Sequence, residues 1–226
     1  MTDKPKWQPL SPIIDCTTEE GLAKGIAAAA EAVRRGELVV MPTDTVYGLG
    51  ADAFSRDAVR AILTAKGRGR EMPPPVLVPN AQTLDGLATN VPAYARELIE
   101  AFWPGPLTVV LVAQSSLMWD LGETNGTVGL RMPKDDTALK LLEEVGPMAV
   151  TSANLTGQAP AQTILAATAQ LGLAVSVYLD AGPCEGSLPS TSLDCTGHTP
   201  RLLRTAALSF ARVPDLMARR ARRERN

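Results

Sequence analysis

Residues 38–50, LVVMPTDTVYGLG, place a short continuous apolar run directly before a polar segment that contains two glycines. The run from Leu38 to Met41 is typical of a strand that is buried on both faces. Before it, residues 17–36 repeat apolar side chains at helical intervals and end at a glycine, which predicts a helix whose capping box pairs Thr17 with Glu20. A helix that leads into a buried strand indicates an α/β arrangement.

The same alternation continues along the chain. Further helices are predicted over residues 55–66, 92–102, 135–146 and 163–171. Ser55, Asn90 and either Asp135 or Asp136 are the expected N-terminal residues of the first three of these helices. Strands are predicted over 76–78, 107–112, 128–132, 148–150 and 174–179, with extended pieces near 190 and 201. We therefore predict an α/β (α+β) fold, a single domain whose twisted mixed sheet is flanked by helices. The predicted domain is 1–207, and 208–226 is predicted to be an arginine-rich C-terminal helix or tail.

Composition excludes several classes of protein. Of the 226 residues, 45% are hydrophobic and 20% are charged, so a disordered chain is excluded. The longest apolar run, residues 107–113, is far below the ~20 residues that span a bilayer, so we predict no membrane contact. No secretory signal is visible, and three cysteines (Cys16, Cys184 and Cys195) are too few for a disulfide framework. These observations predict a cytoplasmic protein.

The net charge of −2 is unevenly distributed. Residues 201–226 hold eight arginines against two acidic residues, whereas the remainder holds 14 basic and 22 acidic residues. An acidic body argues against a protein whose whole surface binds nucleic acid. The tail remains available for a weak contact with RNA or with an acidic partner.

Three polar clusters each follow a predicted strand or helix. Residues 42–50 offer hydroxyls to a polar substrate, or form a tight turn with an Asx contact from Asp44. Residues 66–70 place three cations at a helix end, which suits a polyphosphate; the alternative is a solvated loop, with Lys66 at the helix dipole. Residues 151–154 offer small donors to a phosphate or ribose, or cap a helix.

Familiar catalytic signatures are absent from the sequence. His198 is the only histidine, and its turn-like context disfavours a Ser-His-Asp triad. Cys195 and His198 have no further residues at metal-ligand spacing, so we predict no protein metal site. Neither a Walker A sequence nor a complete dinucleotide fingerprint occurs.

Together, the clusters resemble one known family, the YrdC-type threonylcarbamoyl-AMP synthases, over residues 10–204. The matching segments are 42–50, Lys66-x-Arg68, FWPGPLT at 102–108, GLRMP at 129–133, Ser152-x-Asn154, PST at 189–191, and Arg204. The resemblance implies a YrdC-like fold with a large cationic cavity, in a short form without the accessory C-terminal domain.

The resemblance also implies a reaction. L-Threonine and bicarbonate form a carbamate, which attacks the α-phosphate of ATP to give threonylcarbamoyl-AMP and pyrophosphate, with Mg²⁺ carried in on the ATP. The product passes to a tRNA threonylcarbamoyl transferase complex that modifies adenosine 37 of tRNAs reading ANN codons. This chemistry is mainly a task of positioning, water exclusion and charge stabilisation.

Site residues are implied position by position. The residues implied to act in catalysis on the nucleotide are Lys66, Arg68, Ser152 and Asn154. The nucleotide side is implied to include Thr127 and Arg204 as well. The residues implied to hold threonine are Thr45, Arg131 and Ser190, with Arg131 suited to the carboxylate.

This sequence departs from the family after the basic motif. Many relatives carry proline, asparagine, leucine and histidine where this chain has Gly69, Met72, Pro74 and Leu77. The change to Met72 removes a polar nucleotide contact, and the change to Leu77 removes a contact to threonine. Compensation by Arg70, compensation by Glu71 and a weaker affinity are the open alternatives.

Two other functions remain as alternatives. A YrdC-fold module that binds RNA without catalysis would use the cationic cavity, but the chain has only 3 Phe, 3 Tyr and 3 Trp for base stacking. A relative that forms carbamoyl-AMP, as in hydrogenase-maturation proteins, normally occurs within a longer chain with zinc-finger-like cysteines.

Overall fold

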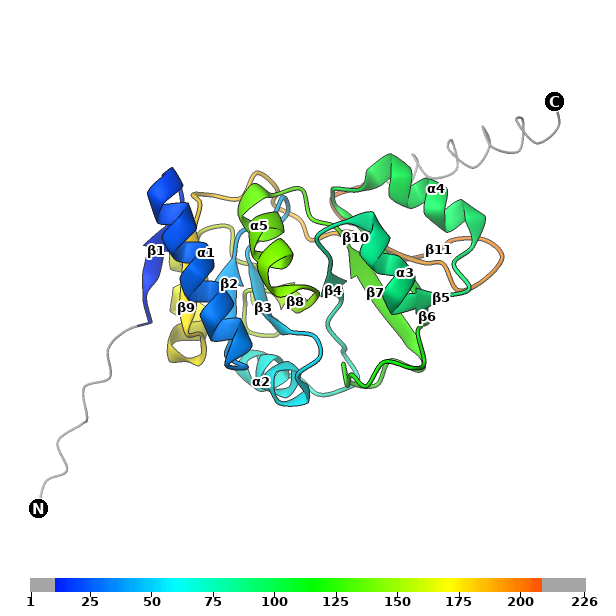
Figure 1. Cartoon of the computed structure of the whole chain (residues 1–226), viewed down its shortest axis with the longest axis horizontal. Coiled ribbons are helices and arrows are strands. Elements are labelled where there is room, and N and C mark those ends of the chain that lie inside the picture. The colour runs from blue at the N-terminus through cyan, green and yellow to red at the C-terminus, as the bar shows by residue number, and fades with distance from the viewer. Residues whose placement is uncertain (1–10, 209–226) are drawn as a thin grey trace, which may run out of the picture.

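A single twisted sheet organises residues 11–208, which are the residues that this computed structural model describes (Figure 1). Its 11 strands include the path β1-β9-β2-β3-β8-β4-β7-β6-β10-β11, and β5 pairs with β6 outside this path. The sheet contains both parallel pairs, such as β2–β9, and antiparallel pairs, such as β3–β8. The predicted mixed sheet flanked by helices is therefore confirmed. Beyond its first residue, the predicted tail at 208–226 lies outside the described residues.

The elements have the following bounds. The strands are β1 (Ile13–Asp15), β2 (Val39–Met41), β3 (Gly48–Asp52), β4 (Val76–Leu77), β5 (Ala88–Thr89), β6 (Leu107–Ala113), β7 (Thr127–Arg131), β8 (Met148–Ser152), β9 (Val177–Asp180), β10 (Thr191–Asp194) and β11 (Arg201–Arg204). The helices are α1 (Glu19–Arg34), α2 (Arg56–Lys66), α3 (Leu84–Leu87), α4 (Ala93–Phe102), α5 (Asp136–Val145) and α6 (Ile164–Leu171), with 3₁₀ turns η1 (Ala81–Thr83) and η2 (Gly172–Ala174). None of the described helices is long and apolar enough to cross a membrane.

Side-chain caps explain where most helices begin. Ser55 Oγ accepts a hydrogen bond from Ala58 N at 3.3 Å, and Asp135 Oδ1 accepts one from Ala138 N at 2.9 Å. Both contacts, to the N–H group three residues later, are those of N-cap residues. At α1 the prediction was one residue early, because Thr18 accepts from Gly21 N at 3.1 Å. The predicted cap Asn90 was wrong, because α4 begins after Pro92 without a side-chain cap.

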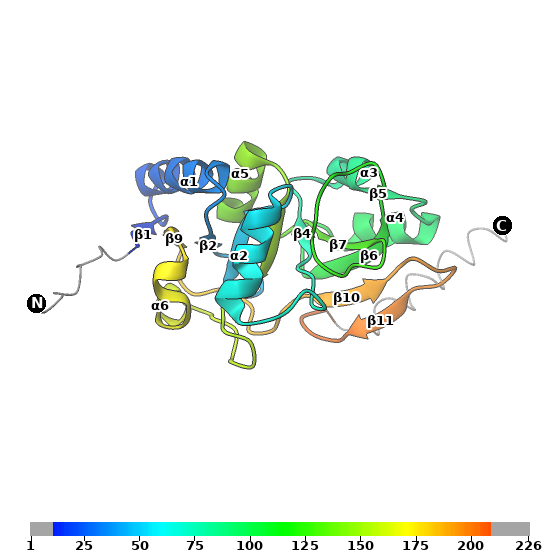
Figure 2. The same cartoon turned by 90° about the horizontal axis from the view of Figure 1, so that it is seen from below.

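Helices cover both faces of the sheet, which explains the continuous apolar run at β2. Val39 and Met41 pack into the core under α1 and α5, which lie side by side on one face (Figure 2). Val40 points to the opposite core, which holds residues of α2 and α6 and continues under α4. A strand with both faces covered must be apolar at every position. Burial of each large aliphatic side chain contributes about 1.5–3 kcal/mol.

Residues 48–50 were predicted as part of a polar turn, and the structure corrects this. They form β3, which runs antiparallel between β2 and β8. A Cβ atom at Gly48 would lie 2.7 Å from Val150 Cγ1, and one at Gly50 would lie 3.0 Å from Met148 Cε. The glycines thus make room for side chains of β8.

Candidate active site

A cavity of about 860 Å³ is lined by residues of β3 and β8 from one half of the sheet and of β6, β7, β10 and β11 from the other half. Its volume is within the range of about 300–1,000 Å³ that is typical of ligand pockets. All nine predicted site residues line it: Thr45, Lys66, Arg68, Thr127, Arg131, Ser152, Asn154, Ser190 and Arg204. They come from the β2–β3 loop, the end of α2, β7, β8 and the loop after it, the β9–β10 connection and β11. Their individual roles stay predictions.

The charged side chains on the cavity lining are mostly positive. Among the described residues that line it are four cations, Lys66, Arg68, Arg131 and Arg204, and one carboxylate, Glu71. Residues 11–208 contain no group of three or more His, Cys, Asp or Glu side chains that could hold a metal ion. The chemistry of the lining suits an anionic ligand.

Lys66 is the last residue of α2, and Gly67 ends the helix in the left-handed conformation with φ 64°. The Lys66 ammonium donates to the main-chain oxygens of Ser152 and Asn154, at 2.6 Å each, rather than to its own helix. Its contact to Asn154 Oδ1 is long, at 3.5 Å, so this third donor is the one available to a ligand. Burial, together with the nearby Arg68, lowers the pKa of Lys66 to about 8.

Arg68 extends into the cavity two residues after Lys66. Its Nε atom is buried and has no hydrogen-bond partner, the one such side-chain atom in the described part of the chain. Burial lowers the pKa of Arg68, and the Glu71 carboxylate opposes this shift. A buried guanidinium donor without an acceptor is costly in the free protein, so the geometry favours a bound anion.

Ser152 and Asn154 contact Lys66 through their main-chain oxygens, and the loop that carries Asn154 is itself held by hydrogen bonds. The side-chain nitrogen of Asn154, Nδ2, donates to Leu155 O at 2.8 Å and to Gln158 O at 2.9 Å, and these two hydrogen bonds hold the loop after β8 in place. Thr156 N donates to Lys66 O at 3.0 Å, so this loop and the end of α2 are joined twice. The two motifs are therefore one structural unit.

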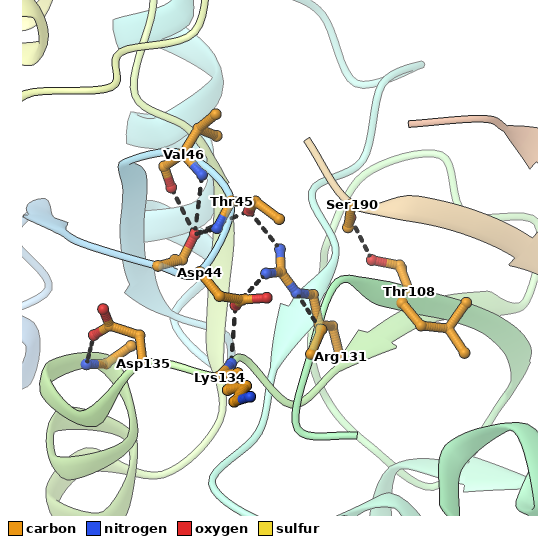
Figure 3. A network of polar contacts seen from close by, with 12 residues as sticks. Asp44, Thr45, Val46, Thr108, Arg131, Lys134, Asp135 and Ser190 are labelled. Atoms are coloured by element: carbon orange, nitrogen blue, oxygen red, sulfur yellow. Dashed lines mark hydrogen bonds and ion pairs between the residues drawn. The ribbon is translucent and has the colours of Figure 1, made fainter. Parts of the chain in front are cut away.

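Arg131, at the end of β7, is 6% exposed and joins the two halves of the sheet (Figure 3). Its Nη2 pairs with Asp44 Oδ1 at 2.6 Å, its Nη1 donates to Thr45 Oγ1 at 3.1 Å, and its Nε donates to Gly105 O at 3.0 Å. A guanidinium has five N–H donors, so two have no partner among residues 11–208. These two donors are free to contact a ligand.

The pairing of Asp44 with Arg131 was not predicted from the sequence. Its carboxylate also accepts from Lys134 N at 2.9 Å, so it links the β2–β3 loop to the segment before α5. The predicted Asx contact within its own turn is not what the structure shows. Asp44 and Arg131 are 87 positions apart in the sequence, and no local pattern pairs them.

Ser190 and Arg204 form the opposite wall. Arg204 donates to Ser190 O at 3.0 Å and to Ser190 Oγ at 3.1 Å. Ser190 Oγ also lies 2.8 Å from Thr108 Oγ1 (Figure 3). Thr127 donates from Oγ1 to Thr124 O at 2.8 Å, in the turn before β7. Ser190, which directly precedes β10, is thus positioned by β6 and β11, the two strands that flank β10.

The departures from the family have distinct surroundings. Leu77 is 3% exposed and packs in the core under α1 and α5, with only its edge on the cavity. Met72 is exposed on the cavity lining. Arg70 forms a surface ion pair with Asp120 at 2.7 Å and does not line the cavity, which leaves Glu71 as the charged neighbour there.

A search of protein-family models matches residues 31–206 to the Sua5/YciO/YrdC family, described as telomere recombination. A Mycobacterium leprae protein, provisionally named threonylcarbamoyl-AMP synthase, is 53% identical over 208 residues, which are 92% of this chain and 94% of that protein. Bacillus subtilis threonylcarbamoyl-AMP synthase is 37% identical over 191 residues, which are 83% of this chain and 55% of that protein.

Among solved structures, Pyrococcus abyssi Sua5 complexed with L-threonine has a TM-score of 0.87 to this chain at 34% identity. The match covers 92% of this chain and 61% of the Pyrococcus protein. The chain therefore spans nearly all of the mycobacterial relative, but less than two thirds of the two longer proteins. Because the family model matches most of its length, the chain belongs to the Sua5/YciO/YrdC family, whose relatives above carry the name threonylcarbamoyl-AMP synthase.

Proposed function

We propose that this protein is an L-threonylcarbamoyladenylate synthase, a nucleotidyltransferase that uses L-threonine, bicarbonate and ATP. The names of its relatives and the threonine complex of the Pyrococcus protein support this proposal. The observation that carries it is the partnerless buried Nε of Arg68 beside the Lys66 ammonium, in a cavity large enough for a nucleotide. An ATP triphosphate supplies the acceptors that these cations lack.

The cavity divides into two sides in this proposal. Lys66 and Arg68, with the loop of Ser152 and Asn154, face the nucleotide, and Thr127 and Arg204 lie on the same side. The two remaining N–H donors of Arg131 receive the threonine carboxylate, with Thr45 and Ser190 beside it. Fixed cations stabilise the charge that develops on the phosphates without any reorganisation of solvent.

The reaction places a carbamate next to the α-phosphate. A carbamate oxygen forms a bond to the α-phosphorus, and the bond from that phosphorus to pyrophosphate breaks, so pyrophosphate leaves with the electron pair. Carbamates are short-lived in water, so an enclosed site that assembles all three substrates protects the intermediate.

Mg²⁺ enters with ATP in this account and neutralises part of the phosphate charge. Among residues 11–208, the cavity lining offers it a single carboxylate, Glu71. This donor set fits an ion held mainly by phosphate oxygens and water, as Mg²⁺ commonly is. The cytoplasmic location, the transfer of the product to a tRNA threonylcarbamoyl transferase complex, and any weak contact with RNA belong to the same proposal.

Pyrophosphate release by the purified protein tests the proposal. Release should require ATP, threonine and bicarbonate together, and Arg68→Ala should lower it by tenfold or more. Arg70→Ala is the matched control, because Arg70 is an arginine of the same loop that pairs with Asp120 outside the cavity. Release that ignores threonine would favour a carbamoyl-AMP-forming enzyme, and salt-sensitive RNA binding without any release would favour an RNA-binding module.

A further inference from the structure

Glu71 is an unpaired carboxylate on a wall that is otherwise cationic. It follows Arg68 by three residues in the loop after α2, and both side chains line the cavity. The Glu71 side chain forms no hydrogen bond or ion pair with another residue among 11–208. A carboxylate only accepts hydrogen bonds and attracts cations, so it does not serve a phosphate group directly. Its place beside the phosphate-binding cations therefore needs another reason.

Gly69 shows where the Glu71 carboxylate lies. A Cβ atom at Gly69 would be 2.1 Å from Glu71 Oε2 and 3.0 Å from Glu71 Oε1, so the carboxylate folds back over the main chain of Gly69. Its charge raises the pKa of Arg68, against the effect of burial, so it lies within electrostatic range of that guanidinium. The family resemblance places proline at this position in many relatives, and the Cβ of a proline would occupy the same space. The absence of a Cβ at Gly69 is what allows this position of the carboxylate.

The charges on the nucleotide side of the cavity nearly balance those of one form of ATP. Arg131 is neutralised by its ion pair with a buried carboxylate. Three cations remain on the lining: Lys66, Arg68 and Arg204. Glu71 lowers their net charge from +3 to +2. At neutral pH free ATP carries about four negative charges, whereas its magnesium complex carries about two, so Glu71 adjusts this side of the cavity to the complex.

A carboxylate at this place acts on the two forms of ATP with opposite sign. It repels the free triphosphate, because like charges brought together at a partly desolvated site cost free energy. It attracts the magnesium complex, since Mg²⁺ is commonly bound by phosphate oxygens and water together with one or two carboxylates. One side chain can therefore decide which form of the nucleotide is preferred.

We propose that Glu71 is a specificity-determining residue that makes the cavity select the magnesium complex of a nucleoside triphosphate over the metal-free triphosphate, and that Gly69 positions its carboxylate. The inference rests on the proposed function, because it takes ATP as the ligand of this side of the cavity. It also answers the loss of a polar nucleotide contact at Met72. Compensation comes from Glu71, one residue earlier, through the cation that accompanies the nucleotide.

Equilibrium titration of the purified protein with ATP, once in excess Mg²⁺ and once in EDTA, tests this selection. Neither amino acid nor bicarbonate is added, so turnover does not enter the measurement. The wild type should bind the magnesium complex at least about tenfold more tightly than free ATP. Glu71→Gln keeps the shape of the side chain and removes its charge. It should reduce the preference by about tenfold, mainly by tightening the binding of free ATP.

Glu123→Gln is the matched control. Glu123 belongs to the β6–β7 connection, and its main-chain N–H donates to Arg70 O at 2.8 Å, so it lies beside the same loop. Glu123 does not line the cavity, and the loss of its charge should leave the preference unchanged. An equal change for both forms of ATP in Glu71→Gln, no change for either form, or the same reduction in Glu123→Gln would overturn the proposal.

The positioning role of Gly69 has its own readout, because Gly69→Ala leaves every charge in place. The new Cβ takes the space of Glu71 Oε2, and the flexible carboxylate moves aside. Gly69→Ala should therefore reduce the preference for the magnesium complex, and it should add nothing in a Glu71→Gln background, as expected for two residues that act through one contact. Additive effects of the two substitutions would refute the role of Gly69.

Failure of the synthase proposal would be visible separately. If the wild type releases no threonine-dependent pyrophosphate but selects the magnesium complex, and Glu71→Gln reduces that selection, the inference stands without the synthase reaction. If the wild type binds both forms of ATP equally, the inference fails and the synthase proposal is untouched. If the wild type binds neither form, both proposals fail.

Discussion

Replacing Lys66 with methionine separates nucleotide binding from folding. The Lys66 side chain is 3% exposed, and its ammonium donates to Ser152 O and Asn154 O at 2.6 Å each. Methionine has a similar length and no charge, so Lys66→Met fills the same space. It removes the Lys66 donor from both carbonyl groups, although Ser152 O keeps a hydrogen bond from Asn154 N at 2.9 Å, and it also removes a buried positive charge.

The two effects on stability oppose each other. The loss of two hydrogen bonds from a charged donor costs about 3–6 kcal/mol, at ~1.5–3 kcal/mol each. Burial lowers the pKa of Lys66 from 10.5 to about 8, and each pKa unit is worth ~1.4 kcal/mol, so removing the charge returns about 3 kcal/mol. The net loss is about 0–3 kcal/mol, which lowers Tm by roughly 0–12 °C in a protein of this size.

Calorimetry and ATP titration of the same Lys66→Met sample check both halves. We expect a folded protein with that modest fall in Tm and an ATP affinity about 10–100-fold below wild type, since a charge-assisted contact to phosphate is lost. Unchanged ATP affinity would show that the ammonium does not face the nucleotide. An unfolded variant would show that its contacts to the loop after β8 are mainly structural.

Three further predictions concern pH, Gly186 in the connection between β9 and β10, and the buried ion pair. Because the pKa of Lys66 is about 8, the affinity for ATP should fall as the pH rises from 7 to 9. Between pH 8 and 10.5 the unfolded chain binds more protons than the folded protein does. The free energy of unfolding should therefore rise over this pH range relative to that of Lys66→Met. Gly186→Ala, whose Cβ meets Thr45 O at 2.8 Å, should cost about 1–3 kcal/mol and raise the KM for threonine, measured by thermal melts and pyrophosphate release. Asp44→Asn leaves the Arg131 charge buried without its partner, so denaturant titration should show a loss of about 3–5 kcal/mol, and a loss below about 1 kcal/mol would contradict the pairing.

Much of the fold could be predicted because its signals are local. The run from Leu38 to Met41 has both faces covered, and each face is filled by helices whose apolar spacing is visible in the sequence. The caps Ser55 and Asp135 mark helix starts within a few residues. β3 was missed because Gly48 and Gly50 suggest a turn, and the side chains of β8 that require them are about 100 positions away.

The candidate site could be predicted as a set of residues but not as a network. Family resemblance gave nine positions, and all of them line one cavity. The contacts that orient them are long-range: Asp44 reaches Arg131, and Lys66 reaches the loop after β8. No periodicity or spacing in the sequence pairs residues that lie 86 to 88 positions apart.

Mass spectrometry of the reaction product tests the synthase proposal most directly. The purified protein would be incubated with ATP, L-threonine and ¹³C-labelled bicarbonate, with Arg68→Ala as the impaired control. We expect a threonylcarbamoyl-AMP species that carries the label from bicarbonate and depends on Arg68. Pyrophosphate release with no labelled threonine adduct, or an adduct that forms equally well in Arg68→Ala, would contradict it.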